Sequence, residues 1–129
     1  MRELIKKIAH TGYQVSDLTR SLAFYEPLGF QRQQRFSKPS PQGTIEVAFL
    51  EMGGAVLELY QLPEGVPFDL PRCGIDHLAL EVSDLDSVQR KLEMLGYPLD
   101  EGPIEEKHVR FLLIRGPDGE RLEFDAFKN

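Results

Sequence analysis

Two histidines and two glutamates occupy corresponding places in the two halves of this 129-residue chain. His10 and Glu58 lie in the first half, and His77 and Glu123 lie in the second. Two neutral imidazoles and two carboxylates provide nitrogen and oxygen ligands for a divalent ion and leave one or two coordination positions for water or substrate. Because the set contains no thiolate, it suits Ni, Zn, Co, Mn or Fe(II) better than a closed structural zinc site. These residues therefore predict a metal site that is open to a small-molecule substrate.

The correspondence between the halves rests on an internal repeat, in which five short blocks recur in the same order. His77 follows His10 by 67 residues within the first of these blocks. The offset then drifts, as expected when loops change length and strands and helices keep theirs. The other blocks are 15–18 and 82–85 (both VSDL), 29–30 and 96–97, 47–50 and 109–112 with an offset of 62, and 57–59 and 122–124 with an offset of 65.

Each half has the pattern of a βαβββ unit. Strands are expected at 8–15 and 75–82, and a helix follows each of them. Asp17 and Ser83 stand where the helix N-caps belong, Ser83 together with Asp86 as a capping box. Pro27 and Gly96 predict the helix ends. Further strands are expected at 30–36, 44–52 and 55–61 in the first half and at 97–101, 108–115 and 120–127 in the second.

The length predicts one domain over residues 1–129, built from two modules. We place the first module at 1–62 and the second at 75–129. The linker between them, 63–74, contains three prolines, which cannot donate hydrogen bonds to a strand ladder.

Strand alternation indicates which residues share a face with the candidate ligands. His10 shares its face with Gly12, and His77 shares its face with Ala79, so a small residue stands beside each imidazole. Taken singly, each histidine or glutamate is also compatible with an ordinary strand residue. The repeat, which produces the same pair twice, favours a shared site.

Several arginines and a lysine are candidates for binding an anionic group of a substrate. Arg121 lies two residues before Glu123 and therefore shares its face. Arg32, Arg35 and Lys38 form a basic run that would either steer an anionic substrate or form a solvated loop.

Composition excludes several classes of partner. The chain has 15 Lys and Arg against 21 Asp and Glu, a net charge of −6, and a pI near 5.1. This balance repels phosphate backbones and anionic lipid, so we expect no nucleic-acid partner and no membrane partner. The single cysteine, Cys73, cannot form an intramolecular disulfide, and no segment has the apolar length of a signal peptide or a membrane span. We therefore expect a cytoplasmic protein.

The paired modules resemble the vicinal oxygen chelate superfamily, which contains glyoxalases, bleomycin-resistance proteins and extradiol dioxygenases. The motifs that carry the resemblance are IAHTGYQVSDLTRSLAFYEPLGF, GIDHLALEVSDLDSVQRKLEMLGY, LELY and GPDGERLEF. The resemblance implies a glyoxalase-like α+β fold, in which two tandem βαβββ modules form a curved sheet that lines a cleft. It also implies metal ligation by His10, Glu58, His77 and Glu123, and this set looks most like glyoxalase I, the lactoylglutathione lyase. The resemblance further suggests a homodimer, with the site formed within one chain or across two.

The implied reaction is a lyase or isomerase reaction on an α-hydroxy or α-keto carbonyl substrate, through a metal-bound enediolate. Glu58 and Glu123 are the expected proton-transfer residues, in either order. Gln14 and Leu62 depart from the glutathione-binding Arg and Asn that are common in bacterial glyoxalase I, so the resemblance implies the reaction type and leaves the substrate open. The alternatives are a methylmalonyl-CoA epimerase-like isomerase, an extradiol-type dioxygenase and a non-catalytic, drug-resistance-like binding protein.

Overall fold

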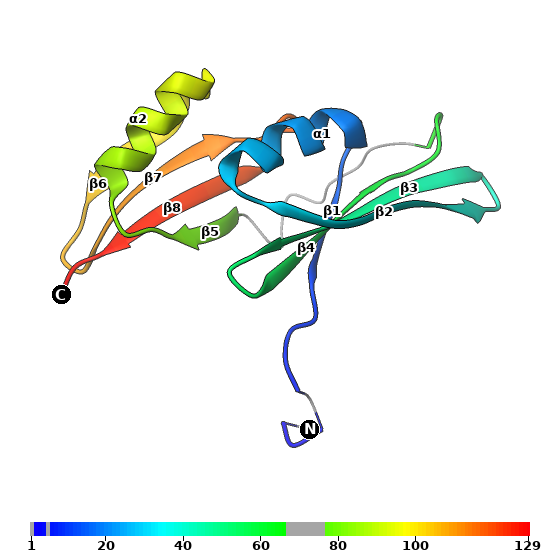
Figure 1. Ribbon diagram of the computed structural model, residues 1–129, viewed down its shortest axis with the longest axis horizontal. Coiled ribbons are helices and arrows are strands. Elements are labelled where there is room, and N and C mark those ends of the chain that lie inside the picture. Colours follow the sequence, from blue (N-terminus) through cyan, green and yellow to red (C-terminus); the bar gives the residue numbers. More distant parts are fainter. Residues whose placement is uncertain (1, 5, 67–76) are drawn as a thin grey trace. The chain divides into compact units, whose positions relative to one another are not determined.

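The computed structural model describes residues 2–4, 6–66 and 77–129 of the chain. It divides into two compact units, Met1–Leu70 and Pro71–Asn129. Most of the predicted linker, together with Cys73 and the start of the predicted strand 75–82, lies outside the described residues. Figure 1 shows the helices and strands of both units.

The first unit is a four-stranded sheet with one α-helix. Strand β1 (Thr11–Gln14) leads into α1 (Leu18–Tyr25), and a short 3-10 turn follows at Glu26–Leu28. The strand order is β1-β4-β3-β2, with β1 parallel to β4 and the other neighbours antiparallel. The remaining strands are β2 (Gln31–Ser40), β3 (Gly43–Met52) and β4 (Ala55–Gln61).

The second unit repeats this arrangement. Strand β5 (His77–Glu81) leads into α2 (Leu85–Leu95), and the strand order β5-β8-β7-β6 again has one parallel pair, β5 with β8. The remaining strands are β6 (Leu99–Glu105), β7 (Val109–Arg115) and β8 (Arg121–Phe127). Both units therefore have the predicted βαβββ order, and the α+β fold class is confirmed.

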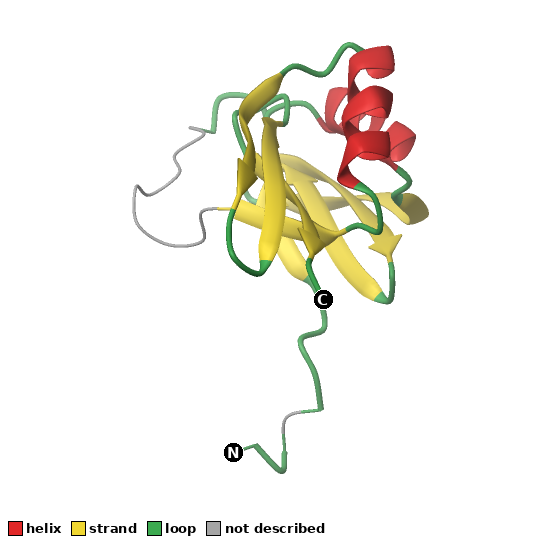
Figure 2. Ribbon diagram, turned by 90° about the vertical axis from the view of Figure 1, so that its left-hand side faces the viewer, coloured by secondary structure: helices red, strands yellow, loops and turns green. Residues whose placement is uncertain are grey.

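In each unit the helix lies against one face of its own sheet (Figure 2), and the buried apolar residues of the helix and the strands form the core. In the first unit α1 buries Leu18 and Leu22 against β3 and β4, which contribute Leu50 and Leu59. In the second unit Leu85 and Leu92 are the buried residues of α2, and β7 and β8 bury Leu112, Ile114 and Leu122. Each fully buried leucine contributes roughly 1.5–3 kcal/mol relative to an exposed one. The opposite face of each sheet carries the candidate ligands.

The helix starts confirm one predicted cap and correct the other. Asp17 caps α1 as predicted, since its carboxylate accepts a hydrogen bond from the Arg20 N–H at 3.1 Å. The cap of α2 is Asp84 rather than Ser83, and the Ser83–Asp86 capping box does not form. The Asp84 carboxylate accepts from two backbone N–H groups and from the Ser87 hydroxyl, which satisfies more orphan donors than a serine at the preceding position could.

The second helix ends at the predicted glycine, whereas the first ends shortly before the predicted proline. Gly96 ends α2 in a left-handed conformation, φ 76°, as predicted. The first helix ends at Tyr25, two residues before Pro27, and Pro27 itself lies within the 3-10 turn. Gly29, with φ 109°, then reverses the chain.

The strand register corrects one part of the internal alignment. Phe49 pairs with Glu58, whereas Leu113 pairs with Glu123, so β3 and β7 correspond with an offset of 64 rather than the expected 62. Ala48 has the same fully buried environment as its counterpart Leu112. A shift of two residues preserves the alternation of faces, which is why the sequence pattern alone favoured the wrong match.

Strand β1 is shorter than expected, and it begins at Thr11 rather than at residue 8. His10 therefore lies immediately before the strand. Within the part of the chain that the structure describes, no helix is long and apolar enough to cross a membrane.

Candidate functional site

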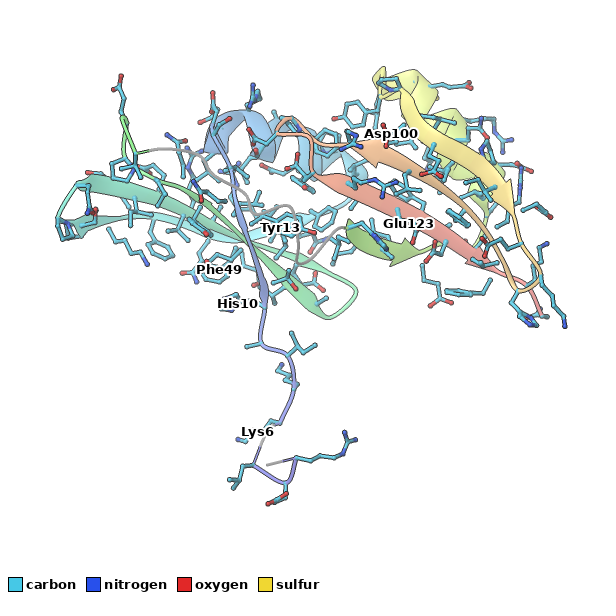
Figure 3. The ribbon with its side chains drawn as sticks, turned by 180° about the vertical axis from the view of Figure 1, so that it is seen from behind. Lys6, His10, Tyr13, Phe49, Asp100 and Glu123 are labelled. Atoms are coloured by element: carbon cyan, nitrogen blue, oxygen red, sulfur yellow. The ribbon has the colours of Figure 1, made fainter. Side chains whose placement is uncertain are left out.

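The first predicted pair, His10 and Glu58, is brought together by the parallel strands β1 and β4. Gly12, two residues after the histidine, is the register partner of Glu58. The imidazole Nε2 of His10 lies 4.0 Å from Glu58 Oε2, and the two side chains are 43% and 24% exposed. Figure 3 shows His10 where the N-terminal segment enters β1. Both groups are thus close together and open to a ligand.

The second predicted pair, His77 and Glu123, has the same construction. Ala79, again two residues after the histidine, is the register partner of Glu123 on the parallel strand β8. His77 Nε2 lies 3.5 Å from Glu123 Oε2, and the side chains are 40% and 16% exposed. The duplication has therefore preserved the strand pairing, the small residue and the histidine–glutamate proximity together.

The sequence predicted room beside each imidazole at Gly12 and Ala79, and in the structure Gly12 lies next to the Glu58 carboxylate. A Cβ atom at Gly12 would come within 3.5 Å of Glu58 Oε1, which is ordinary van der Waals contact. A residue with a longer side chain at this position would project into the space that the carboxylate and the imidazole share. Glycine and alanine thus suit a place where two polar side chains must converge.

Two aromatic side chains border the first pair on one side. Phe49, which is directly opposite Glu58 in the antiparallel register, contacts the His10 ring edge to face, with centroids 5.6 Å apart and an interplanar angle of 86° (Figure 3). Phe36 stacks on Phe49 with centroids 6.2 Å apart and an angle of 16°. The His10 imidazole is therefore packed against a carbon surface on one side and faces Glu58.

Charged side chains surround the second pair. Asp125 and Arg121 share the face of Glu123, and Glu81 is the register partner of Asp125. Burial raises the pKa of Glu123, and the nearby Asp125 carboxylate raises it further, although His77 and Arg121 act in the opposite direction. Glu123 is consequently a better proton acceptor than an ordinary surface carboxylate.

Arg121 shares the face of Glu123, as its spacing predicted, but its guanidinium contacts carboxylates of β6. Its Nη2 donates to Glu101 Oε2 at 2.8 Å, and its Nε lies 3.7 Å from Asp100 Oδ2. Asp100, labelled in Figure 3, also accepts a hydrogen bond from Arg115 Nε at 3.0 Å. The positive charge of Arg121 is therefore already balanced within its own unit.

The basic run of the first unit lies mainly on the other face of the sheet. Arg32 contacts Glu26, and Arg35 Nη2 donates to Thr19 Oγ1 at 3.0 Å, on the side that carries α1. The cause is a register irregularity between Arg32 and Gln34, which turns both arginines toward the helix face. These two arginines therefore do not face His10 and Glu58.

The donor atoms of each pair fit a divalent ion. Two ligands at 2.0–2.2 Å from one tetrahedral ion lie about 3.3–3.6 Å apart, so the 3.5 Å separation already fits and the 4.0 Å separation is closed by a small side-chain rotation. Within either unit taken alone, however, the described residues contain no group of three or more His, Cys, Asp or Glu side chains that could hold a metal. Each unit thus supplies half of the four-residue set that the sequence predicted.

Two neighbours of these pairs were not found from the sequence. Phe49 and Asp125 modify the surroundings of His10 and Glu123 through cross-strand and same-face proximity, which depends on register. The only sequence signal for Asp125 was its place two residues after Glu123 on one strand.

Comparisons with known proteins agree with this architecture. Residues 7–124 match the Glyoxalase/Bleomycin resistance protein/Dioxygenase superfamily. The chain is 33% identical to the uncharacterized protein YwbC of Bacillus subtilis (strain 168), over 94% of this chain and 98% of that protein. It is 31% identical to the uncharacterized protein YaeR of Escherichia coli (strain K12), over 92% and 95% of the two chains. A glyoxalase family protein from Bacillus cereus has a similar fold, with a TM-score of 0.79, 17% identity, and coverage of 97% of this chain and 96% of that chain.

Proposed function

Since the chain belongs to the Glyoxalase/Bleomycin resistance protein/Dioxygenase superfamily, we propose that it is a metal-dependent enzyme with the reaction type of glyoxalase I (lactoylglutathione lyase) and a substrate of its own. Its reaction is a lyase or isomerase reaction that moves a proton next to the carbonyl of an α-hydroxy or α-keto carbonyl compound. The observation that carries the proposal is the duplicated pair: His10 with Glu58 and His77 with Glu123, each in the same strand register.

In this proposal His10, Glu58, His77 and Glu123 together hold one divalent ion, which is Ni, Zn, Co, Mn or Fe. The set of two imidazole nitrogens and two carboxylate groups would suit these metals. When bound, such an ion supplies a Lewis acid that stabilises negative charge on a substrate oxygen.

The two glutamates carry the proton in this mechanism. One carboxylate accepts the proton as the C–H bond next to the carbonyl breaks, and the electron pair passes toward the carbonyl oxygen. A carboxylic acid then returns a proton to the former carbonyl carbon, and the hydroxyl proton passes to the former carbonyl oxygen, so the reaction needs no oxidant or reductant. Because both glutamates occupy the same strand register, either order is compatible with this scheme: Glu123 accepts the proton and Glu58 returns it, or the reverse.

Replacement of Glu123 tests the assignment. Glu123→Gln keeps the shape of the side chain but removes the base. It should therefore abolish exchange of the hydroxyacetone α-protons with deuterated water, which proton NMR measures. The metal should be retained with lower affinity. Glu93→Gln, the same chemical change on the exposed surface of α2, should leave exchange unchanged. Near-normal exchange in Glu123→Gln would show that this carboxylate is not the base.

The same samples separate the alternative activities. Proton exchange at the α-carbon of a CoA ester would point to an epimerase-like isomerase, and oxygen consumption with a catechol would point to an extradiol-type dioxygenase. A ligand bound by metal-free protein without turnover would point to a drug-resistance-like binding protein. We further propose a cytoplasmic homodimer, consistent with the single cysteine of the sequence and with the family.

A further inference from the structure

We infer that the substrate of the proposed site is an uncharged compound with an aromatic or apolar substituent, rather than an anionic thioester or glutathione adduct. The inference rests on the proposed function, since it assigns the chemical class of substrate to the same residues. It follows from the residues that lie around each histidine–glutamate pair within its own unit.

The first pair is bordered by an exposed aromatic surface. Phe49 contacts the His10 ring, and Phe36 continues this surface along the sheet, stacked on Phe49 and 38% exposed. In the register Phe36 pairs with Val47, and Val47 pairs with Tyr60, so this row of the sheet face is also largely carbon. An aromatic substituent of a ligand gains about 0.5–1.5 kcal/mol from ring packing of this kind, in addition to the area that it buries.

Positive charge is largely absent from the described part of this face. Arg32 and Arg35 are turned toward α1, as described above. Lys38 lies on the same face as Phe36, and its register partner is Ile45. Gln34 pairs with Phe49, which in turn pairs with Glu58, so Lys38 is four residues along β2 from the position level with Glu58. At roughly 3.4 Å per strand residue this separation exceeds the Debye length of about 8 Å at physiological salt. An anionic group directly beside His10 would therefore have no arginine or lysine of β2 as a neighbour.

The second pair lies among carboxylates. Asp125 and Glu81 share the face of Glu123, while Arg121 contacts Asp100 and Glu101 of its own unit. Arg115, which lies on the same face, also contacts Asp100. An anionic substituent of the substrate would have to compete with Asp100 and Glu101 for the arginines. It would also be repelled by Asp125 and Glu81. Both halves thus disfavour a negative substituent, and the first half favours a ring.

A matched pair of ligands tests this inference. The neutral compound is 2-hydroxyacetophenone, and its charged partner is 4-(2-hydroxyacetyl)benzoate, which has the same reacting oxygens and one added carboxylate. Both are titrated in buffer containing zinc into protein with labelled phenylalanine, and the Phe36 and Phe49 ring signals are followed by NMR. We expect the neutral compound to shift both ring signals and to bind at least tenfold more tightly than the carboxylate.

Variants show whether the aromatic surface is responsible. Phe36→Leu keeps the surface apolar but removes the ring. It should therefore weaken the binding of 2-hydroxyacetophenone by about three- to tenfold and leave the binding of hydroxyacetone, which has no ring, unchanged. Arg35→Gln is the matched control, and it should change neither ligand because the arginine contacts α1.

The possible outcomes separate this inference from the proposed function. The inference would be overturned if the carboxylate bound as tightly as the neutral compound or more tightly. It would also be overturned if Arg35→Gln weakened binding of the carboxylate, or if neither aryl compound bound. Selective binding of the neutral compound without exchange of its α-protons would support the inference and contradict the proposed reaction.

Discussion

The contact between Phe49 and His10 leads to a quantitative prediction for metal binding. His10 lies before β1, so no strand pairing holds its backbone, and its side chain is 43% exposed. The Phe49 ring packs edge to face against the imidazole and limits its rotation. In the second unit the corresponding residue is Leu113, and there His77 is held within the strand pairing of β5. Phe49→Leu therefore places a leucine at this position, as in the second unit, but the backbone of His10 is still not held by strand pairing.

The size of the effect follows from the geometry of the ring pair. An edge-to-face contact at this separation contributes about 0.5–1.5 kcal/mol. Without it, metal binding must restrict an imidazole that would otherwise sample other rotamers. The affinity for Ni²⁺ or Co²⁺ should fall by roughly two- to tenfold, since 1.4 kcal/mol corresponds to a factor of ten. The change from Phe to Leu should cost the fold less than about 1.5 kcal/mol, so the variant remains folded.

Calorimetric titration of metal-free protein measures the affinity, and proton NMR of the His10 ring in the same sample reports its packing independently. Phe49→Leu should remove the ring-current shift of the imidazole signals, whereas Phe49→Tyr should retain both the shift and the affinity. Phe36→Leu is the matched control, because Phe36 stacks on Phe49 rather than contacting His10, and its metal affinity should change by less than about twofold. If Phe49→Leu loses the ring-current shift but binds metal as tightly as the wild type, the reasoning is refuted.

The remaining predictions concern the scaffold. A Cβ atom at Gly102, where φ is +89°, would lie 2.8 Å from the Phe111 carbonyl oxygen, so Gly102→Ala should lower the free energy of unfolding by about 1–3 kcal/mol or more in urea titrations. Gly119→Ala, at φ +81° with no atom nearby, should cost less, and equal losses would contradict the steric argument. Hydrogen bonds from Ser87 lower the pKa of Asp84 below its usual 3.8, so its carboxylate stabilises the fold above that pH, and the contribution is lost as the pH falls through the folded-state pKa. Asp84→Asn should therefore reduce the fall in Tm below pH 3.8, and an unchanged pH profile would contradict this assignment.

The internal repeat made the fold class and the two pairs accessible from sequence. The VSDL blocks located both helices, and the matched LEL and LEF segments located Glu58 and Glu123 on equivalent strands. Strand pairing then brings each glutamate beside its histidine, as the duplicated pattern suggested.

Features that depend on register were not accessible in the same way. A two-residue slip leaves the apolar alternation intact, so the pattern could not place Phe49, rather than a neighbouring residue, opposite Glu58. The irregularity next to Arg32 exchanges the faces of the following residues, and no sequence signal marks it. The cap of α2 could have been found, because Asp84 follows Asp17 by the same 67 residues as the histidines.

The most direct test of the central proposal is calorimetric titration of chelator-treated protein with Ni²⁺ and Co²⁺. A site built from His10, Glu58, His77 and Glu123 predicts one ion per chain, whether the set comes from one chain or from two chains of a dimer. His10→Ala and His77→Ala should each weaken binding by at least about a hundredfold, more than the loss of an outer-shell partner. Absence of metal uptake by the wild type, or uptake that neither substitution weakens, would contradict the proposed metal site.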